Sequence, residues 1–358
     1  MYIPDDPEKK YKKTDSDKII FLHGVGDNID IHIPLMRDFL ADSNENCEAY
    51  ADGMKAFDRP LPVRISWECA GSYHYLLKVS ENENMSNPWI FETDDCYYDV
   101  YNLKIGTRYY WTVTAIKNSE TVFTAGAGTF STFDAAPRNL FIDGAVVNAR
   151  DIGGWSTLNG RKVKQGLVYR SGAFDGYNGS GMDEYITPDG KNVMKNLLGI
   201  KTEIDLRVDH KTEDAYPPQE RTSSVLGSGV SYCHCPILLG GENYLKSKDS
   251  LRNFFGILAD PDNYPVTYHC AVGADRTGAV TYLLNGLLGV SREDLIRDYL
   301  ITNFSYQQKY RAPVSGMYVE TIDNYNGLTL QEKIYNYLAK EIGVPTSELD
   351  FIIDRLTE

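Results

Sequence analysis

One stretch near residue 270 restricts the fold of this chain more than any other part of the sequence. Residues 264–267 are β-prone, residues 268–278 have the pattern of a tight loop, and residues 279–284 are helix-prone. A strand that passes through a short loop directly into a helix is the building unit of α/β sheets. Successive N–H groups of such a loop can surround one anion, above the positive end of the helix dipole. The stretch therefore predicts an α/β domain that binds an anion, and phosphate is the anion we expect there.

The side chains of this loop combine a nucleophile with an anion clamp. Cys270 lies at the focus of the loop amides and the helix dipole, a field that lowers the pKa of a thiol from its usual ~8.5. Arg276 presents a planar fork that can hold two phosphoryl oxygens as charge shifts during transfer. Thr277 can donate its hydroxyl to the sulfur, and His269 can orient the loop from behind. The residues predicted to bind the phosphate are Ala271, Val272, Gly273, Ala274, Asp275 and Arg276.

The complete motif is more specific than its two reactive residues. A buried cysteine is usually an inert small side chain, and an arginine six positions after a cysteine occurs by chance in many chains. Here His precedes the Cys, Gly stands in the middle of the loop, and Arg-Thr-Gly closes it, with a strand before and a helix after. The sequence therefore favours a functional loop over an accidental one.

This motif resembles the CX5R P-loop of cysteine-dependent phosphatases, and in particular that of the bacterial tyrosine-phosphatase-like family, whose loop carries Asp directly before the Arg. Residues 148–154, 166–172 and 198–207 resemble three further segments of that family and follow its order. The resemblance covers about residues 139–358. One position departs from it, because the family often has Lys before the Asp and this chain has Ala274.

The resemblance implies an α/β phosphatase domain, with a central sheet flanked by helices, that hydrolyses a phosphomonoester through a cysteinyl-phosphate without a cofactor or metal. Cys270 and Arg276 would be catalytic. The family-like choice of general acid is Asp275, because no Trp-Pro-Asp segment occurs in the chain. The alternative for Asp275 is a purely structural ion pair with Arg276 or a neighbouring arginine. Asp205 is the reserve candidate for the acid.

Four further polar residues are expected near the loop. Arg150 and Asp151 would brace it, or contact the substrate, through charge-assisted hydrogen bonds. A buried strand over residues 202–206 would deliver Asp205 and Arg207 to its carboxyl end, where the ligand crevice of an open α/β sheet lies.

Helices are predicted from residue 187 to 198, from 291 to 303, from 328 to 342 and from 346 to 356.

Three functions fit these residues. The first is a protein-tyrosine phosphatase, with dual specificity kept open, acting on a phosphorylated protein or a small phosphomonoester. The second is an inositol phosphate or phosphoinositide phosphatase, which the methyl side chain of Ala274 disfavours because a polyanionic head group gains most from positive charge at the loop. The third is an inactive phospho-binding or adhesion module, against which the intact Cys270, Asp275, Arg276 and Thr277 argue.

The N-terminal part of the chain has an all-β pattern. Apolar and polar residues alternate in several runs between residues 59 and 132, and residues 103–109 resemble the corner before the sixth strand of fibronectin type III domains. The predicted boundaries are an N-terminal extension over 1–57, a fibronectin type III-like β-sandwich over 58–135 and a tyrosine-phosphatase-like catalytic domain over 139–358. The sandwich carries no evident chemistry, so we expect it to act as a spacer or to dock a protein or surface partner.

Composition limits the partners and the compartment. A net charge of −14 over 358 residues argues against nucleic acid and anionic membranes as partners. No apolar run is long enough to insert into a membrane. The first residues lack a signal region, so we expect a cytoplasmic protein, or a secreted or cell-surface one if a signal peptide was removed. Cys233, His234 and Cys235 suggest a metal site only weakly, and free thiols packed in a sheet are favoured.

Overall fold

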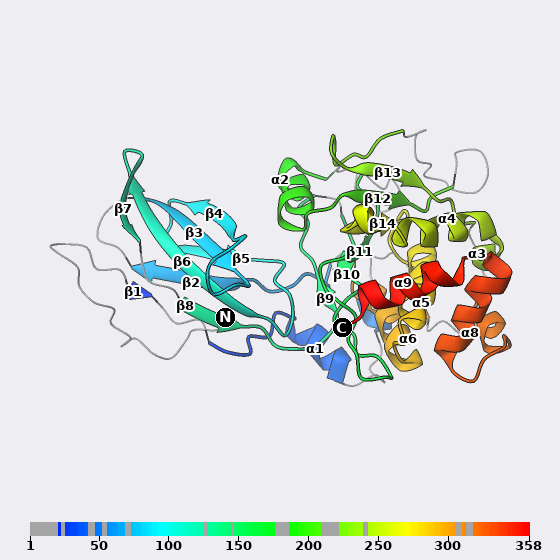
Figure 1. Cartoon of the computed structure of the whole chain (residues 1–358). Coiled ribbons are helices and arrows are strands. Elements are labelled where there is room, and N and C mark those ends of the chain that lie inside the picture. The colour runs from blue at the N-terminus through cyan, green and yellow to red at the C-terminus, as the bar shows by residue number, and fades with distance from the viewer. Residues whose placement is uncertain are drawn as a thin grey trace. The chain divides into compact units, whose positions relative to one another are not determined.

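The computed structural model describes residues 21–22, 26–41, 47–51, 56–68, 73–124, 128–144, 146–175, 186–208, 222–238, 243–305, 310–312 and 318–358. The chain forms two compact units (Figure 1). The first contains the described residues up to Ile31 together with Pro60–Ala135, and the second contains His32–Arg59 and Ala136–Glu358. The early segment His32–Arg59 is therefore part of the same unit as the predicted catalytic loop.

The first unit consists of two antiparallel sheets. One has the order β1 (Phe21–Leu22), β2 (Val63–Glu68), β5 (Tyr97–Val100), and the other has the order β4 (Trp89–Thr93), β3 (His74–Ser80), β6 (Arg108–Lys117), β7 (Glu120–Thr124), with β8 (Gly128–Ser131) also paired to β6. Alternate side chains of β6 are buried, as the period of two in its sequence predicts. The rings of Trp67 and Tyr75 meet edge to face at 5.3 Å between centroids, so the two sheets contact each other.

A tyrosine fixes the corner before β6. The hydroxyl group of Tyr109 accepts a hydrogen bond of 2.7 Å from the backbone N–H of Lys104. The ring itself is buried and stacks on Phe130. A tyrosine whose hydroxyl binds the backbone a few residues upstream is typical of β-sandwich domains.

The second unit is built on a six-stranded sheet in the order β13-β12-β14-β11-β10-β9. The strands are β13 (Ser231–His234), β12 (Thr202–Asp205), β14 (Val266–His269), β11 (Val168–Ser171), β10 (Arg150–Asp151) and β9 (Arg138–Asn139). The first four run parallel to one another. The strand β10 runs antiparallel to β11, and β9 runs antiparallel to β10. The carboxyl ends of β12, β14 and β11 therefore lie at one edge of the sheet, where ligand sites of open α/β sheets occur.

Helices pack on both faces of this sheet (Figure 1). They are α1 (Pro34–Ala41), η1 (Glu48–Tyr50), α2 (Pro188–Asn192), η2 (Val193–Leu197), α3 (Asn243–Lys246), α4 (Lys248–Leu258), η3 (Pro261–Asn263), α5 (Asp275–Leu287), α6 (Arg292–Leu300), η4 (Ile301–Phe304), α7 (Tyr318–Asp323), α8 (Leu330–Tyr337), η5 (Leu338–Ile342) and α9 (Thr346–Leu356). Successive residues of β11 point to opposite sides, so Val168 joins the large core with α1 and α4–α9, and Tyr169 joins a smaller core beside η2.

The local signals at the helix ends act as predicted. The hydroxyl group of Thr187 caps α2 by accepting from the N–H of Gly190, and Gly199 follows η2 with a φ of +70°. Ser291 caps α6 in the same way. The helix α5 is buried on all sides from Arg276 to Leu287, and both α6 and α8 pack against it.

Candidate active site

The predicted anion loop lies between β14 and α5. Cys270 directly follows the strand, and the helix begins at Asp275. Gly273 has a φ of +69°, and a Cβ atom there would lie 2.6 Å from the backbone carbonyl atoms of Ser171 at the end of β11. Only glycine fits both this backbone conformation and this close approach. The loop is thus pressed against the carboxyl end of the neighbouring strand.

The surroundings of Cys270 favour its thiolate. Burial acts to raise the pKa of this thiol, since its residue is only 2% exposed. The charge of Arg276 and the hydroxyl and N–H groups of Thr277 act in the opposite direction and outweigh burial, so the pKa is lowered. The Thr277 hydroxyl is buried without another hydrogen-bond partner among the described residues, which leaves it available to the sulfur.

Two side chains hold the loop from behind. The Nδ2 group of Asn148 and the guanidinium of Arg170 both donate to the carbonyl oxygen of Gly273, at 2.8 Å and 2.7 Å. Within the described part of the chain, the N–H groups of Gly273 and Ala274 donate to no backbone carbonyl. Anchored carbonyl groups together with unused amides are what an anion-binding loop requires.

A buried ion cluster supports these braces. Asp298 on α6 accepts hydrogen bonds from Arg150 at 2.9 Å and from Arg170 at 2.8 Å. Burial acts to raise the pKa of Asp298, but the two guanidinium groups outweigh it and lower the pKa. Arg150 also donates to the side chain of Asn148 and is 1% exposed. Of the two roles expected for Arg150, the geometry agrees with bracing the loop.

Asp151 stabilises a different part of the backbone. Its carboxylate accepts from the N–H groups of Gly153 and Gly166 at 2.8 and 2.7 Å, and from Arg138 at 2.9 Å. Burial is the largest influence on Asp151 and raises the pKa of its carboxyl group. These contacts hold together the two ends of the connection between β10 and β11.

A second buried cluster lies under the strand that leads to the loop. The Nε2 atom of His269 lies 3.0 Å from Glu203, and its Nδ1 atom lies 3.9 Å from Asp205. Burial acts to lower the pKa of His269, but the two carboxylates raise it overall. Asp205 is fully buried and also binds Arg207 at 2.7 Å, and Arg207 in turn binds Asp175 at 2.8 Å. The reserve acid Asp205 therefore lies inside the fold in ion pairs.

Asp275, in contrast, remains accessible. Its side chain is 30% exposed at the start of α5. One carboxylate oxygen accepts from the hydroxyl group of Tyr299 at 3.2 Å, and the other lies 3.4 Å from the guanidinium of Arg311. Its neighbour Ala274, where the family often has Lys, is fully buried.

The comparison with known proteins now decides the family. A model of the tyrosine phosphatase family matches residues 143–358, more than half of the chain. The chain belongs to this family. The family resemblance of the loop is thereby confirmed.

Individual relatives are more distant. A curated protein of Cupriavidus necator, named as a tyrosine-protein phosphatase, is 26% identical over an alignment of 183 residues, and the match covers 44% of this chain and 61% of that protein. The core catalytic domain of the PP-IP phosphatase Siw14 from S. cerevisiae, in complex with citrate, shares 17% identity over 53% of this chain and 93% of that chain, with a TM-score of 0.33. A fibronectin type III domain from a human protein shares 17% identity over 29% of this chain and 83% of its own, with a TM-score of 0.20.

Several site residues of this tyrosine-phosphatase family member escaped the sequence analysis. They are Glu203, Asp298, Tyr299 and Arg311. Glu203 lies inside a segment that resembles the family, but nothing in that segment identifies its partners. Asp298, Tyr299 and Arg311 come from regions that read only as helical scaffold or loop. Their roles follow from tertiary packing against the loop.

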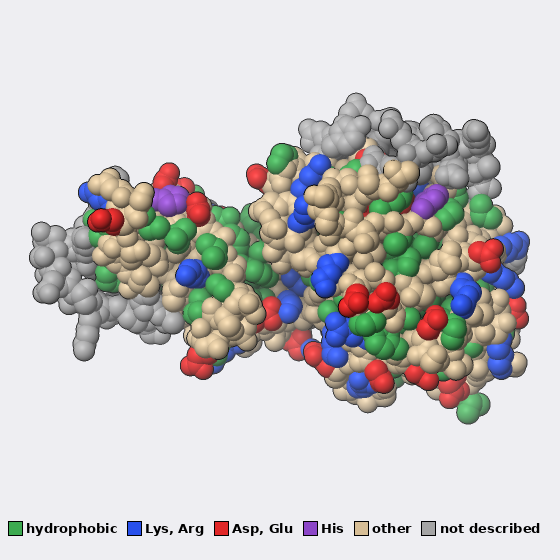
Figure 2. Space-filling view, turned by 45° about the horizontal axis from the view of Figure 1, so that its top comes forward, with side chains coloured by type: hydrophobic (Ala, Val, Ile, Leu, Met, Phe, Trp, Pro, Cys, Tyr) green, Lys and Arg blue, Asp and Glu red, His purple; other side chains and the backbone are tan. Residues whose placement is uncertain are grey.

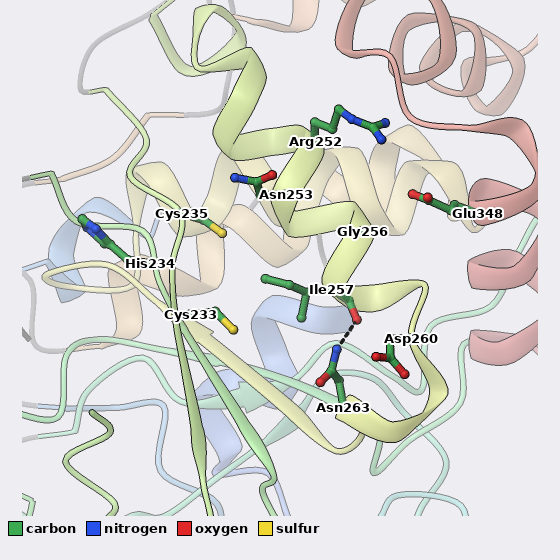
Figure 3. A pocket seen from close by; sticks show the side chains of 10 residues that line it. All are labelled: Cys233, His234, Cys235, Arg252, Asn253, Gly256, Ile257, Asp260, Asn263 and Glu348. Carbon is green, nitrogen blue, oxygen red and sulfur yellow. Dashed lines mark hydrogen bonds between the residues drawn. The ribbon is translucent and has the colours of Figure 1, made fainter. Parts of the chain in front are cut away.

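The suggested Cys–His–Cys site lies at a separate pocket of about 470 Å³ beside β13 and α4 (Figure 3). The sulfur atoms of Cys233 and Cys235 face α4, and His234 points away and donates to the carbonyl oxygen of Arg207 at 2.7 Å. Within the described ranges, no group of three or more His, Cys, Asp or Glu side chains is arranged to hold a metal ion. Both cysteines are free thiols.

Proposed function

We propose that this chain is a phosphomonoester hydrolase that forms a cysteinyl-phosphate at Cys270 and acts on phosphotyrosine. The observation that carries the proposal is a buried thiol whose pKa is lowered by Arg276, at the first position of a loop above a helix N-terminus; among the described residues, the Gly273 and Ala274 amides of this loop donate to no backbone carbonyl. Such a site combines a nucleophile with preorganised stabilisation of phosphoryl charge.

The residues take complementary roles in two steps. The Cys270 thiolate attacks phosphorus, the bond to the leaving oxygen breaks, and Asp275 gives that oxygen a proton. Water then attacks phosphorus, Asp275 takes up its proton, and the phosphorus–sulfur bond breaks to release inorganic phosphate and thiolate. Arg276 and the loop amides hold the equatorial oxygens throughout.

Charge around the loop favours a substrate with a single phosphate. Arg150, Arg170 and Arg207, which could have lined the rim, are at most 3% exposed and paired with buried carboxylates. A polyphosphorylated ring would gain little from them. An aromatic phosphate ester has no second anionic group, so its binding is not weakened by the burial of these arginines.

We also propose that the first unit is a fibronectin type III-like sandwich that docks a protein or surface partner. Its two antiparallel sheets and the hydrogen bond between Tyr109 and Lys104 support the fold. Its separate core supports a role outside the chemistry.

A substrate panel tests the proposal. We expect phosphotyrosine peptides to be hydrolysed with a higher kcat/KM than phosphoserine peptides or inositol phosphates, without a divalent ion and in the presence of chelator. Cys270→Ser should bind substrate and lose turnover by orders of magnitude, because a serine hydroxyl is almost fully protonated. A preference for inositol phosphates would favour the second function, and no turnover of any phosphate ester would favour the inactive module.

A further inference from the structure

The carboxylate of Asp275 is held at both of its oxygens. Tyr299 donates to Oδ1 and Arg311 to Oδ2, at 3.2 Å and 3.4 Å. The Asp275 side chain is nevertheless 30% exposed and that of Arg311 19%. An accessible carboxylate that carries one donor on each oxygen has a restricted rotation about its terminal bond. It can therefore present the same oxygen in each catalytic cycle.

A buried asparagine fixes the backbone of Arg311. Asn303 accepts from the N–H of Arg311 at 2.7 Å and donates to its carbonyl oxygen at 2.9 Å. Asn303 is fully buried in η4, which directly continues α6. Since both main-chain groups of Arg311 are tied to one side chain, the start of its side chain has a defined place next to the loop.

Two consecutive elements, α6 and η4, carry three residues of this arrangement. Asp298 and Tyr299 are consecutive residues of α6, and Asn303 follows in η4. Asp298 supports the loop through its ion pairs with Arg150 and Arg170. Tyr299 donates a hydrogen bond to Asp275. The segment α6–η4 therefore fixes the position of the Cys270 loop relative to the proposed acid Asp275.

We propose that Arg311 is a positioning residue for Asp275 and, together with Tyr299, aims its carboxyl group at the leaving oxygen of the substrate. This inference rests on the proposed phosphatase function and on Asp275 as its acid. Arg311 acts through Asp275 and does not itself bind the phosphate that is transferred. Its removal should consequently weaken proton transfer to the leaving group more than it weakens substrate binding.

Leaving groups of different basicity test this role. A nitrophenol leaves readily without a proton, whereas an unsubstituted phenol depends on one. We expect Arg311→Ala to lower kcat/KM for phenyl phosphate by about tenfold or more and to change that for p-nitrophenyl phosphate by less than about threefold, with most of the loss in kcat. Tyr299→Phe should shift the same ratio to a smaller extent.

A matched control lies on the same helix. Arg297 also forms ion pairs, with Asp294 at 2.6 Å and Glu293 at 3.1 Å. Arg297→Ala should leave the ratio of the two substrates unchanged. Arg311→Lys keeps a donor and a charge, so it should recover part of the loss, and its thermal unfolding should match that of the parent.

A double-mutant cycle decides whether Arg311 acts through Asp275. In the Asp275→Asn background, Arg311→Ala should cause no further loss, because the group it positions can no longer donate the same proton. An equal loss in both backgrounds, or a loss confined to KM, would overturn the proposal and assign Arg311 to substrate binding. If the parent hydrolyses neither ester, the proposed function itself fails, which is a separate result.

Discussion

At the scale of single residues, the site depends on opposite influences acting on one thiol. Burial disfavours the Cys270 thiolate, whereas Arg276 and Thr277 favour it and prevail. The thiolate of Cys270 is therefore stabilised by a few nearby groups and not by exposure to water.

Alkylation of Cys270 measures this balance. We expect its reaction rate with iodoacetate to reach a plateau at a lower pH than that of a cysteine in a model peptide, because the thiolate fraction saturates above a lowered pKa. Arg276→Ala should move the plateau to higher pH, since burial then acts with less opposition. Cys270→Ser identifies the signal of this thiol among the other free cysteines. A plateau at the same pH as that of the model peptide, or at a higher one, would contradict the assignment.

The Asp298 cluster should dominate stability near the loop. Asp298→Asn leaves Arg150 and Arg170 buried beside an uncharged group, which typically costs about 3–5 kcal/mol. The pKa of Asp298 is lowered in the folded state, so its contribution is present above the unfolded pKa of ~3.9 and is lost as pH falls through the folded value. The difference between parent and variant should thus shrink in acid.

An exposed ion pair supplies the comparison for this measurement. Asp99 binds Arg64 at 2.7 Å in the first unit, with the Arg64 side chain 60% exposed. Asp99→Asn should cost less than about 1 kcal/mol. Equal costs of Asp99→Asn and Asp298→Asn in urea unfolding would count against a special role for the buried cluster.

At the scale of elements, the close contact between the loop and β11 decides which backbone is possible. Gly273 and Gly160 both have positive φ angles, of +69° and +83°, but only Gly273 faces backbone atoms at close range. Two alanine substitutions can therefore separate the conformational cost from the steric one.

Gly160→Ala should cost about 1–2 kcal/mol and leave turnover unchanged, because it adds only an unfavourable backbone conformation. Gly273→Ala carries the same cost and also pushes the loop from Ser171. We expect it to be less stable than Gly160→Ala and to lose activity at least about tenfold, as oriented groups are displaced. Full activity of a folded Gly273→Ala variant would show that the loop tolerates displacement.

The elements also show what sequence can predict. The strand–loop–helix around Cys270, the caps at Thr187 and Ser291 and the corner at Tyr109 follow from neighbouring residues, and all were predicted. The contacts of Asp275 were not, because Tyr299 and Arg311 lie 24 and 36 residues further along the chain. Such pairings depend on how α6 packs, which local patterns do not encode.

At the scale of the whole molecule, the two units should respond separately to mutation. Phe39 of α1 is buried in the core of the second unit and packs on Phe304 at 4.9 Å between ring centroids. The residues before the sandwich therefore stabilise the second unit, which contains the Cys270 loop. The sequence pattern gave no sign of this, because the segment was expected to be an extension.

Phe39→Ala should destabilise the second unit by about 3–5 kcal/mol and lower the temperature at which activity is lost. Phe130→Ala, at an equally buried position of β8, should destabilise the first unit and leave that temperature unchanged. Thermal inactivation followed together with calorimetry distinguishes the two. A common shift in both variants would mean that the units unfold as one.

The pairing of charges inside the second unit has a consequence for how fast substrate arrives. Arg138, Arg150, Arg170 and Arg207 are matched by Asp151, Asp298, Asp205 and Asp175, so these buried clusters are neutral as a group. The excess of 14 negative charges therefore lies outside them. Figure 2 shows acidic side chains interspersed with basic ones over the visible surface of the second unit. The phosphate ester of the proposed reaction is an anion, so it diffuses toward a protein whose net charge repels it at long range. Encounter should consequently become faster as ionic strength rises, opposite to enzymes that steer their substrates electrostatically.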